Sequence, residues 1–73
     1  MMTTQNQITI RVNGEDKQVA SGITVATLLE QMALPSGRVA VEYNRAILPR
    51  AQWAGTSIAP GDQFEIVQFV GGG

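Results

Sequence analysis

The residues Gln7-Ile8-Thr9-Ile10-Arg11-Val12-Asn13-Gly14 set the architecture of this chain. Apolar and polar side chains alternate over residues 7–12, which is the period-two pattern of a half-buried strand. Asn13-Gly14 follows at once, and this dipeptide is the strongest short signal for a hairpin turn. Residues 17–20 are then predicted to form a short returning strand, with Val19 pointing inward. The sequence therefore predicts an antiparallel β-hairpin at the start of the fold.

An amphipathic helix is predicted after this hairpin. Four apolar residues recur at positions i, i+3, i+4 and i+7 of one helical face: Val25, Leu28, Leu29 and Met32. Thr24 stands where the N-cap belongs, because its hydroxyl can accept a hydrogen bond from a backbone N–H one turn later. The helix is expected to end at Pro35-Ser36-Gly37, since this run is typical of a helix stop.

Three further strands are predicted in the second half of the chain. Residues 38–43 alternate again, residues 46–48 form a short strand before a proline, and residues 63–70 form the last strand. Residues 50–54 are predicted to form a single helical turn. Trp53 in this turn is interpreted as a packing anchor with one polar edge.

This order of elements predicts an α+β fold. A hairpin, a helix that crosses it and a further antiparallel region give a β-grasp (ubiquitin-like) roll, a mixed sheet with one main helix on one face. We expect residues 1–70 to form this domain and residues 71–73 to form a flexible C-terminal glycine tail. The predicted core consists of Ile8, Ile10, Val25, Leu28, Leu29, Val39, Val41, Phe64 and Ile66.

The last strand has two faces with different expected roles. Alternation directs Phe64 and Ile66 toward the helix, and it directs Val67 and Phe69 away from the helix. Exposed apolar side chains on so small a protein often mark a surface for a partner. The alternatives are that a loop covers them, or that they are the ordinary scattered apolar residues of a protein surface.

The chain ends in Gly71-Gly72-Gly73, directly after an apolar run. Three glycines without side chains form a thin thread that can enter a channel too narrow for other residues. The only reactive group of this thread is the terminal carboxylate of Gly73, which is a poor electrophile until it is activated. We therefore expect a small folded domain that presents its own C-terminus as a substrate. A frayed terminus without a function is the alternative.

Composition argues against several classes of function. The chain has 73 residues, which gives one domain with little volume for a buried active site. It has no cysteine and no histidine, so a thiol nucleophile, a thiolate metal site and the usual general base are missing. A net charge of −1 argues against a nucleic-acid surface. No apolar run approaches the roughly 20 residues of a membrane span. The first residues do not resemble a signal peptide, so we expect a soluble, cytoplasmic protein.

Motifs over nearly the whole chain after Gln5 carry a resemblance to a known family. They are Val12-Asn13-Gly14, Thr24-Val25 with Leu28-Leu29, Val39-Ala40-Val41 with Asn44, Ile47-Leu48-Pro49-Arg50 with Trp53, Pro60-Gly61-Asp62, and Phe69-Val70-Gly71-Gly72-Gly73. Together they make the chain resemble the ThiS family, the ubiquitin-like sulfur carriers of thiamine biosynthesis. One departure is Asn44-Arg45, where many members have Asn-Gly, and it changes only a hairpin tip.

The resemblance implies a mechanism. An adenylating enzyme of the ubiquitin-activating type uses MgATP to adenylate the carboxylate of Gly73. A sulfur donor such as a cysteine desulfurase then supplies a persulfide sulfur, and the resulting thiocarboxylate gives its sulfur to thiazole synthase. In this scheme Gly71 and Gly72 give the C-terminal segment its length and its narrow cross-section, whereas Val67 and Phe69 form the docking surface. The carrier binds no cofactor or metal, contributes no catalytic side chain and is monomeric when free.

Other functions remain open on the sequence alone. The small subunit of molybdopterin synthase would carry the same thiocarboxylate, although the short length and the segment of Pro49-Arg50 with Trp53 favour the thiamine member. A protein modifier would be ligated through Gly73 to target lysines, and a binding module could carry an incidental glycine tail. An enzyme is least favoured, because its candidate acids, Glu15-Asp16, lie at a predicted hairpin tip that faces water.

Overall fold

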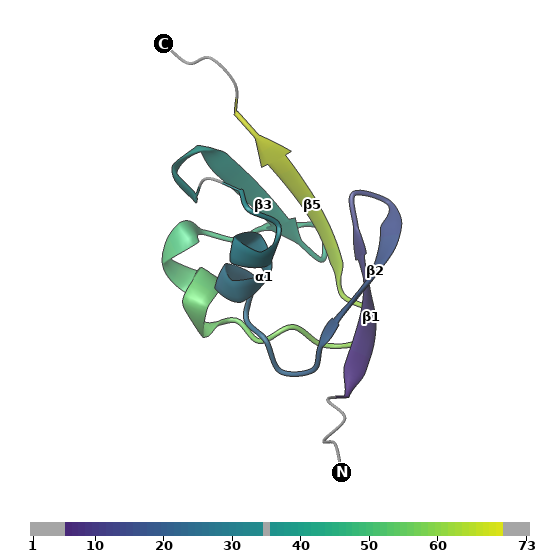
Figure 1. Ribbon diagram of the computed structural model, residues 1–73. Coiled ribbons are helices and arrows are strands. Elements are labelled where there is room, and N and C mark those ends of the chain that lie inside the picture. The colour runs from purple at the N-terminus through teal and green to yellow at the C-terminus, as the bar shows by residue number, and fades with distance from the viewer. Residues whose placement is uncertain (1–5, 35, 70–73) are drawn as a thin grey trace.

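The computed structural model describes residues 6–34 and 36–69. Five strands form one mixed sheet in the order β2-β1-β5-β3-β4, and the helix α1 packs on one face of it (Figure 1). The strands are β1 (Gln7–Val12), β2 (Glu15–Ala20), β3 (Val39–Tyr43), β4 (Ala46–Ile47) and β5 (Gln63–Gln68). The helices are α1 (Val25–Gln31) and the short 3₁₀ segments η1 (Ser36–Arg38) and η2 (Arg50–Gly55). The predicted α+β roll with one main helix is confirmed.

The β1–β2 hairpin turns on two residues, as predicted. Asn13 and Gly14 have φ angles of 52° and 84°, and a type I′ turn requires positive φ at both central positions. Glu15 pairs directly with Val12, so β2 begins immediately after the turn. The expectation that Glu15-Asp16 forms the hairpin tip is therefore wrong. A two-residue turn leaves no further loop residues, and both acids belong to the strand.

The helix α1 begins and ends through identifiable caps. The Thr24 hydroxyl accepts a hydrogen bond from the Thr27 N–H at 3.2 Å, which confirms the predicted N-cap. At the other end Leu34 N–H donates to the Leu29 carbonyl, and Ala33 adopts a positive φ of 59°. These features form a Schellman motif, which ends the helix before the predicted proline-glycine stop.

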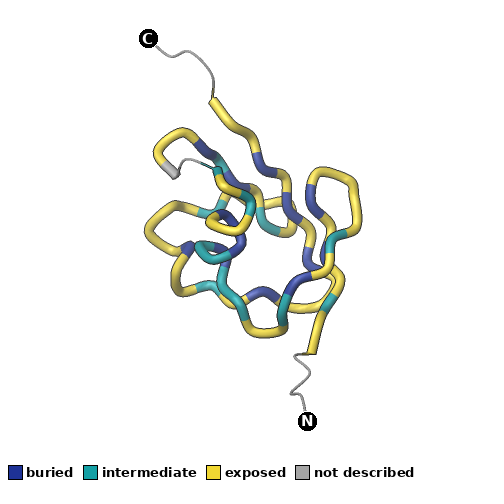
Figure 2. The backbone as a smooth tube through the Cα atoms, viewed as in Figure 1, coloured by how far each residue is buried: buried dark blue, intermediate teal, exposed yellow. Residues whose placement is uncertain are grey.

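The core lies between α1 and the sheet (Figure 2). Eight of the nine predicted core residues are buried, and the ninth, Ile8, is half-buried and packs against them. Trp53 is 5% exposed and its Nε1–H donates to the Leu48 carbonyl at 3.0 Å, so its predicted role as a packing anchor is confirmed. The other buried apolar side chains are Val12, Val19 and Ile58.

The last strand ends slightly earlier than predicted. β5 ends at Gln68, and one further ladder bond joins the Phe69 N–H to the Arg38 carbonyl at 2.7 Å. Val70, the predicted end of the strand, lies outside the described residues, as does the predicted boundary between residues 70 and 71. In the part of the chain that the structure describes, no helix has the length and apolar character needed to cross a bilayer.

Candidate functional site

β5 lies in the middle of the sheet, and its side chains alternate between the face that packs against α1 and the opposite face. Phe64 and Ile66 point into the core and are 1% and 8% exposed. Val67 and Phe69 belong to the opposite set, and each is 55% exposed. Their predicted exposure is confirmed, and Figure 2 shows this end of β5 as a continuous exposed segment. Two large apolar side chains therefore face solvent shortly before Gly71-Gly72-Gly73 in the sequence.

A third exposed apolar side chain shares this face of the sheet. Ile47 on β4 is 67% exposed and pairs with Glu42 on β3, which in turn pairs with Glu65 on β5. Residues directly opposite each other on neighbouring strands share a face, so Ile47 lies on the same surface as Val67. We call this surface, with Ala40, Ile47, Val67 and Phe69 as its apolar residues, the outer face.

Sequence reasoning assigned no functional role to Ile47. The signal that could have placed it was the two-residue turn Asn44-Arg45, which sets Glu42 opposite Ile47. Glu42 lies off the inward set of β3, so the partner of Glu42 must also point outward. The outer face also carries Glu42 and Glu65 directly opposite each other, an arrangement of like charges that weakens a strand pair.

A buried carboxylate fixes the point where β5 begins. Asp62, which is 8% exposed, accepts hydrogen bonds from the Tyr43 hydroxyl at 2.9 Å and from the Ala59 N–H at 2.8 Å. The Asn44 side-chain amide donates to its other oxygen at 3.2 Å. The hydrogen bond to Asp62, burial and the negative charge of Asp62 raise the pKa of Tyr43. The turn before β5 is thereby attached to the end of β3.

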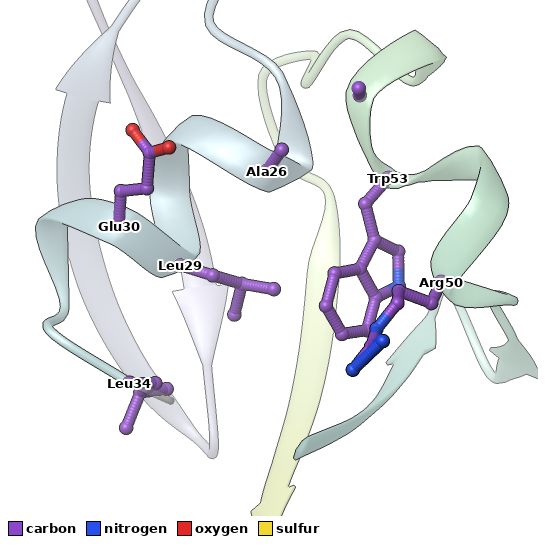
Figure 3. A pocket seen from close by; sticks show the side chains of 7 residues that line it. Ala26, Leu29, Glu30, Leu34, Arg50 and Trp53 are labelled. Carbon is purple, nitrogen blue, oxygen red and sulfur yellow. The ribbon is translucent and has the colours of Figure 1, made fainter. Parts of the chain in front are cut away.

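A hollow lies on the opposite side of the sheet, between α1 and η2 (Figure 3). Its volume is about 360 Å³, and it is lined by Ala26, Leu29, Glu30, Leu34, Arg50, Trp53 and Ala54. Figure 3 shows the side chains of the helix α1 and those of η2 on opposite walls. Because this hollow lies on the helix side of the sheet, it does not belong to the outer face.

In residues 6–34 and 36–69, no group of three or more His, Cys, Asp or Glu side chains is placed to hold a metal ion. Gly71, Gly72 and Gly73, the predicted threading and sulfur-attachment residues, lie outside the described part of the chain. Their roles remain predictions from the sequence.

The sequence from residue 10 to residue 73 matches the family model described as the ThiS family. The chain belongs to the ThiS family. The sulfur carrier protein ThiS of Escherichia coli (strain K12) is 39% identical to it over 64 residues, which cover 88% of this chain and 97% of that protein. The crystal structure of the thiamine biosynthesis protein ThiS from Geobacter metallireducens matches it with a TM-score of 0.79 and 32% identity. That match covers 90% of this chain and 100% of the Geobacter chain.

A second kind of relative is much longer than this ThiS-family chain. A thiazole synthase of Paramagnetospirillum magneticum (strain ATCC 700264 / AMB-1) is 40% identical to it over 62 residues, which cover 85% of this chain and 19% of that enzyme. The chain spans about a fifth of the length of the two curated thiazole synthases that it matches. A ThiS-like segment therefore occurs within proteins that are named for thiazole synthesis.

Proposed function

We propose that this chain is a sulfur carrier of thiamine biosynthesis. In this role its C-terminal carboxylate becomes a thiocarboxylate and gives up its sulfur in thiazole formation. The observation that carries the proposal is a ThiS-family sequence in which Gly71-Gly72-Gly73 follow shortly after the exposed residues Val67 and Phe69. Similarity to the ThiS protein of Escherichia coli over nearly the whole length of both chains supports it.

The first step is activation of the terminal carboxylate. A partner enzyme of the ubiquitin-activating type binds MgATP, and a carboxylate oxygen of Gly73 attacks the α-phosphorus while pyrophosphate leaves. The product is an acyl-adenylate, whose carbonyl carbon is a good electrophile because AMP is a good leaving group. The chain itself is the substrate in this step, and we assign no catalytic side chain to it.

The second step introduces sulfur. A donor such as a cysteine desulfurase supplies a persulfide, whose terminal sulfur attacks the acyl carbon and displaces AMP. A thiol then attacks the donor's sulfur in the resulting acyl disulfide, so that a disulfide forms between the thiol and the donor and the thiocarboxylate of Gly73 is released. Thiazole synthase is the proposed acceptor of this sulfur, and the similarity of the chain to part of two thiazole synthases supports this choice.

The fold contributes the docking surface and the strand that precedes the C-terminal glycines in the sequence. We assign docking to the outer face through Val67 and Phe69, because both are more than half exposed and lie within four residues of Gly71 in the sequence. Burying such apolar side chains against a partner is favourable. Gly71 and Gly72 have no side chains and let the terminus pass through a narrow channel to the nucleotide.

The test uses the full-length protein and a ThiS-activating enzyme. We expect ATP–pyrophosphate exchange that depends on the carrier. After addition of a cysteine desulfurase and cysteine, the intact mass should increase by the difference between one sulfur and one oxygen atom. Thiazole synthase should then return the mass to its original value. Absence of exchange would overturn the proposal. Transfer of the sulfur only to a molybdopterin precursor would instead place the protein in molybdopterin biosynthesis. Isopeptide products on lysines would favour a protein modifier.

A further inference from the structure

The two edges of β5 are supported unequally. Along the β3 edge, pairing runs from Tyr43–Phe64 to Val39–Gln68, and the Phe69 N–H extends it by one bond. Along the β1 edge, the register pairs in the described sheet are confined to Gln63 and Phe64, because β1 ends where its hairpin turns. Among the residues that the structure describes, the C-terminal half of β5 therefore has no neighbouring strand on this edge.

Beyond the end of β1, the side chain of Asn13 continues the hydrogen bonding to β5. Its backbone N–H donates to the Phe64 carbonyl at 2.8 Å, which is the last backbone bond of the parallel ladder on this side. Its Oδ1 then accepts the Ile66 N–H at 2.7 Å, and its Nδ2 donates to the Ile66 carbonyl at 3.3 Å. A primary amide offers the same donor and acceptor as a peptide group. The Asn13 side chain thus supplies the next rung of the ladder to a residue 53 positions away.

Two requirements meet at position 13. The type I′ turn needs a positive φ, and asparagine tolerates the observed 52° better than most residues. The bond to Ile66 needs both a donor and an acceptor. Glycine would meet only the first requirement, and an ionised aspartate would offer acceptors alone.

We propose that Asn13 is a positioning residue for adenylation of the C-terminus. The inference rests on the proposed sulfur-carrier function. By holding Ile66 on the edge that β1 does not reach, Asn13 fixes the path of residues 67–69, from which the chain continues to Gly73. Transfer of an adenylyl group from a bound nucleotide tolerates little misplacement of the attacking carboxylate. Loss of the Asn13 amide should therefore lower the rate of adenylation, while docking through the outer face persists.

Asn44 provides a matched control at the other end of β5. It has a similar φ of 51° at a hairpin tip, and its Oδ1 accepts the Gln63 N–H at 2.8 Å. Glycine at either position keeps the turn conformation and removes the side-chain bonds to β5. Asn44→Gly thus removes comparable hydrogen bonds, to Gln63 and Asp62, at the start of the strand rather than in its C-terminal half.

The experiment compares wild type, Asn13→Gly and Asn44→Gly in ATP–pyrophosphate exchange, at a temperature where melts show all three to be folded. We expect Asn13→Gly to lower kcat by about 10- to 100-fold with KM changed by less than about twofold. Asn44→Gly should stay within about twofold of wild type in both constants. In the free protein, amide exchange at Phe69 should be about 2- to 10-fold faster in Asn13→Gly, because this variant loses both side-chain hydrogen bonds to Ile66. It should be unchanged in Asn44→Gly.

Equal kcat values for the two variants, or a Phe69 amide unaffected by Asn13→Gly, would overturn the inference and leave the sulfur-carrier function standing. A wild-type protein without exchange activity would instead overturn the proposed function, and with it the role of Asn13.

Discussion

The Tyr43 hydroxyl lies 2.9 Å from Oδ2 of Asp62 and donates a hydrogen bond to it. Tyr43 is the last residue of β3, and Asp62 immediately precedes β5. The bond therefore joins the ends of two paired strands through their side chains. The centroid of the Tyr43 ring also lies 5.2 Å from that of the buried Phe64 ring, so Tyr43 contacts the core as well.

Replacement of Tyr43 by phenylalanine should lower the free energy of unfolding by about 1 kcal/mol, the typical net value of one hydrogen bond. The ring contact with Phe64 persists in this variant, so the change isolates the hydroxyl. Urea denaturation of wild type and Tyr43→Phe measures the difference. An unchanged midpoint would show that water replaces the hydroxyl at Asp62 without cost.

The stability of the fold should also depend on the ionisation of Tyr43. Its hydrogen bond to Asp62, then burial, then the charge of Asp62 raise its pKa above the ordinary value of 10.0. A raised pKa in the folded state means that the stabilising contribution is complete below the unfolded-state pKa and is lost as the pH rises through the folded-state pKa.

Wild type should therefore lose more stability than Tyr43→Phe as the pH rises above about 10, the ordinary tyrosine pKa. Urea midpoints across this range measure the effect. Tyr43 is the only tyrosine in the sequence, so tyrosinate absorbance reports its titration directly. Parallel pH profiles for the two proteins would contradict this assignment.

Truncation of Leu28 tests the predicted core. Its side chain is fully buried between α1 and the sheet, so Leu28→Ala should cost roughly 2–5 kcal/mol of unfolding free energy. In a domain of this size that is a large part of the total. The exposed Glu30 on the same helix is the control, since Glu30→Ala should change stability by less than about 0.5 kcal/mol. Similar denaturation curves for the two variants would show that the helix face is misassigned.

Replacement of Arg45 by glycine should stabilise the fold. Arg45 has a φ of 75° in the two-residue turn between β3 and β4, a conformation that costs a residue with a Cβ about 1–2 kcal/mol. Arg45→Gly should raise the unfolding free energy by about 1 kcal/mol, because part of this gain is offset by the entropy of glycine. Arg45→Ala keeps the Cβ and should show no such gain. Equal stabilities of the glycine and alanine variants in thermal melts would show that the backbone at residue 45 is not strained.

Substitution of Phe69 and deletion of Gly73 separate docking from chemistry. Phe69 is 55% exposed, so Phe69→Arg should keep stability within about 1 kcal/mol of wild type. The variant should bind the activating enzyme much more weakly, since it places an unpaired charge in an apolar interface. Deletion of Gly73 should leave binding intact and abolish ATP–pyrophosphate exchange. The carboxylate then ends one residue, about 3.5 Å, too early.

A pull-down, a thermal melt and the exchange assay distinguish these effects. Phe69→Arg that unfolds the protein would place Phe69 in the core. Exchange at the wild-type rate without Gly73 would show that the terminal residue is not the one adenylated.

Local patterns in the sequence were sufficient to predict the secondary-structure elements and which residues face each side of the sheet. Alternation separated Ile66 from Val67, the Asn13-Gly14 dipeptide fixed the first turn, and the spacing after Thr24 predicted α1. These predictions succeed because hairpin turns, helix caps and side-chain direction depend on residues only a few positions apart.

Contacts between distant segments were decided only by the tertiary structure. The sequence contains no local signal that Asn13 would reach Ile66, that Asp62 would hold Tyr43, or that Ile47 would share a face with Val67. Each of these contacts depends on strand order and register. Both are set when the inward apolar surface of the sheet is buried against α1, because a slip of one residue would turn the inward set of a strand toward solvent.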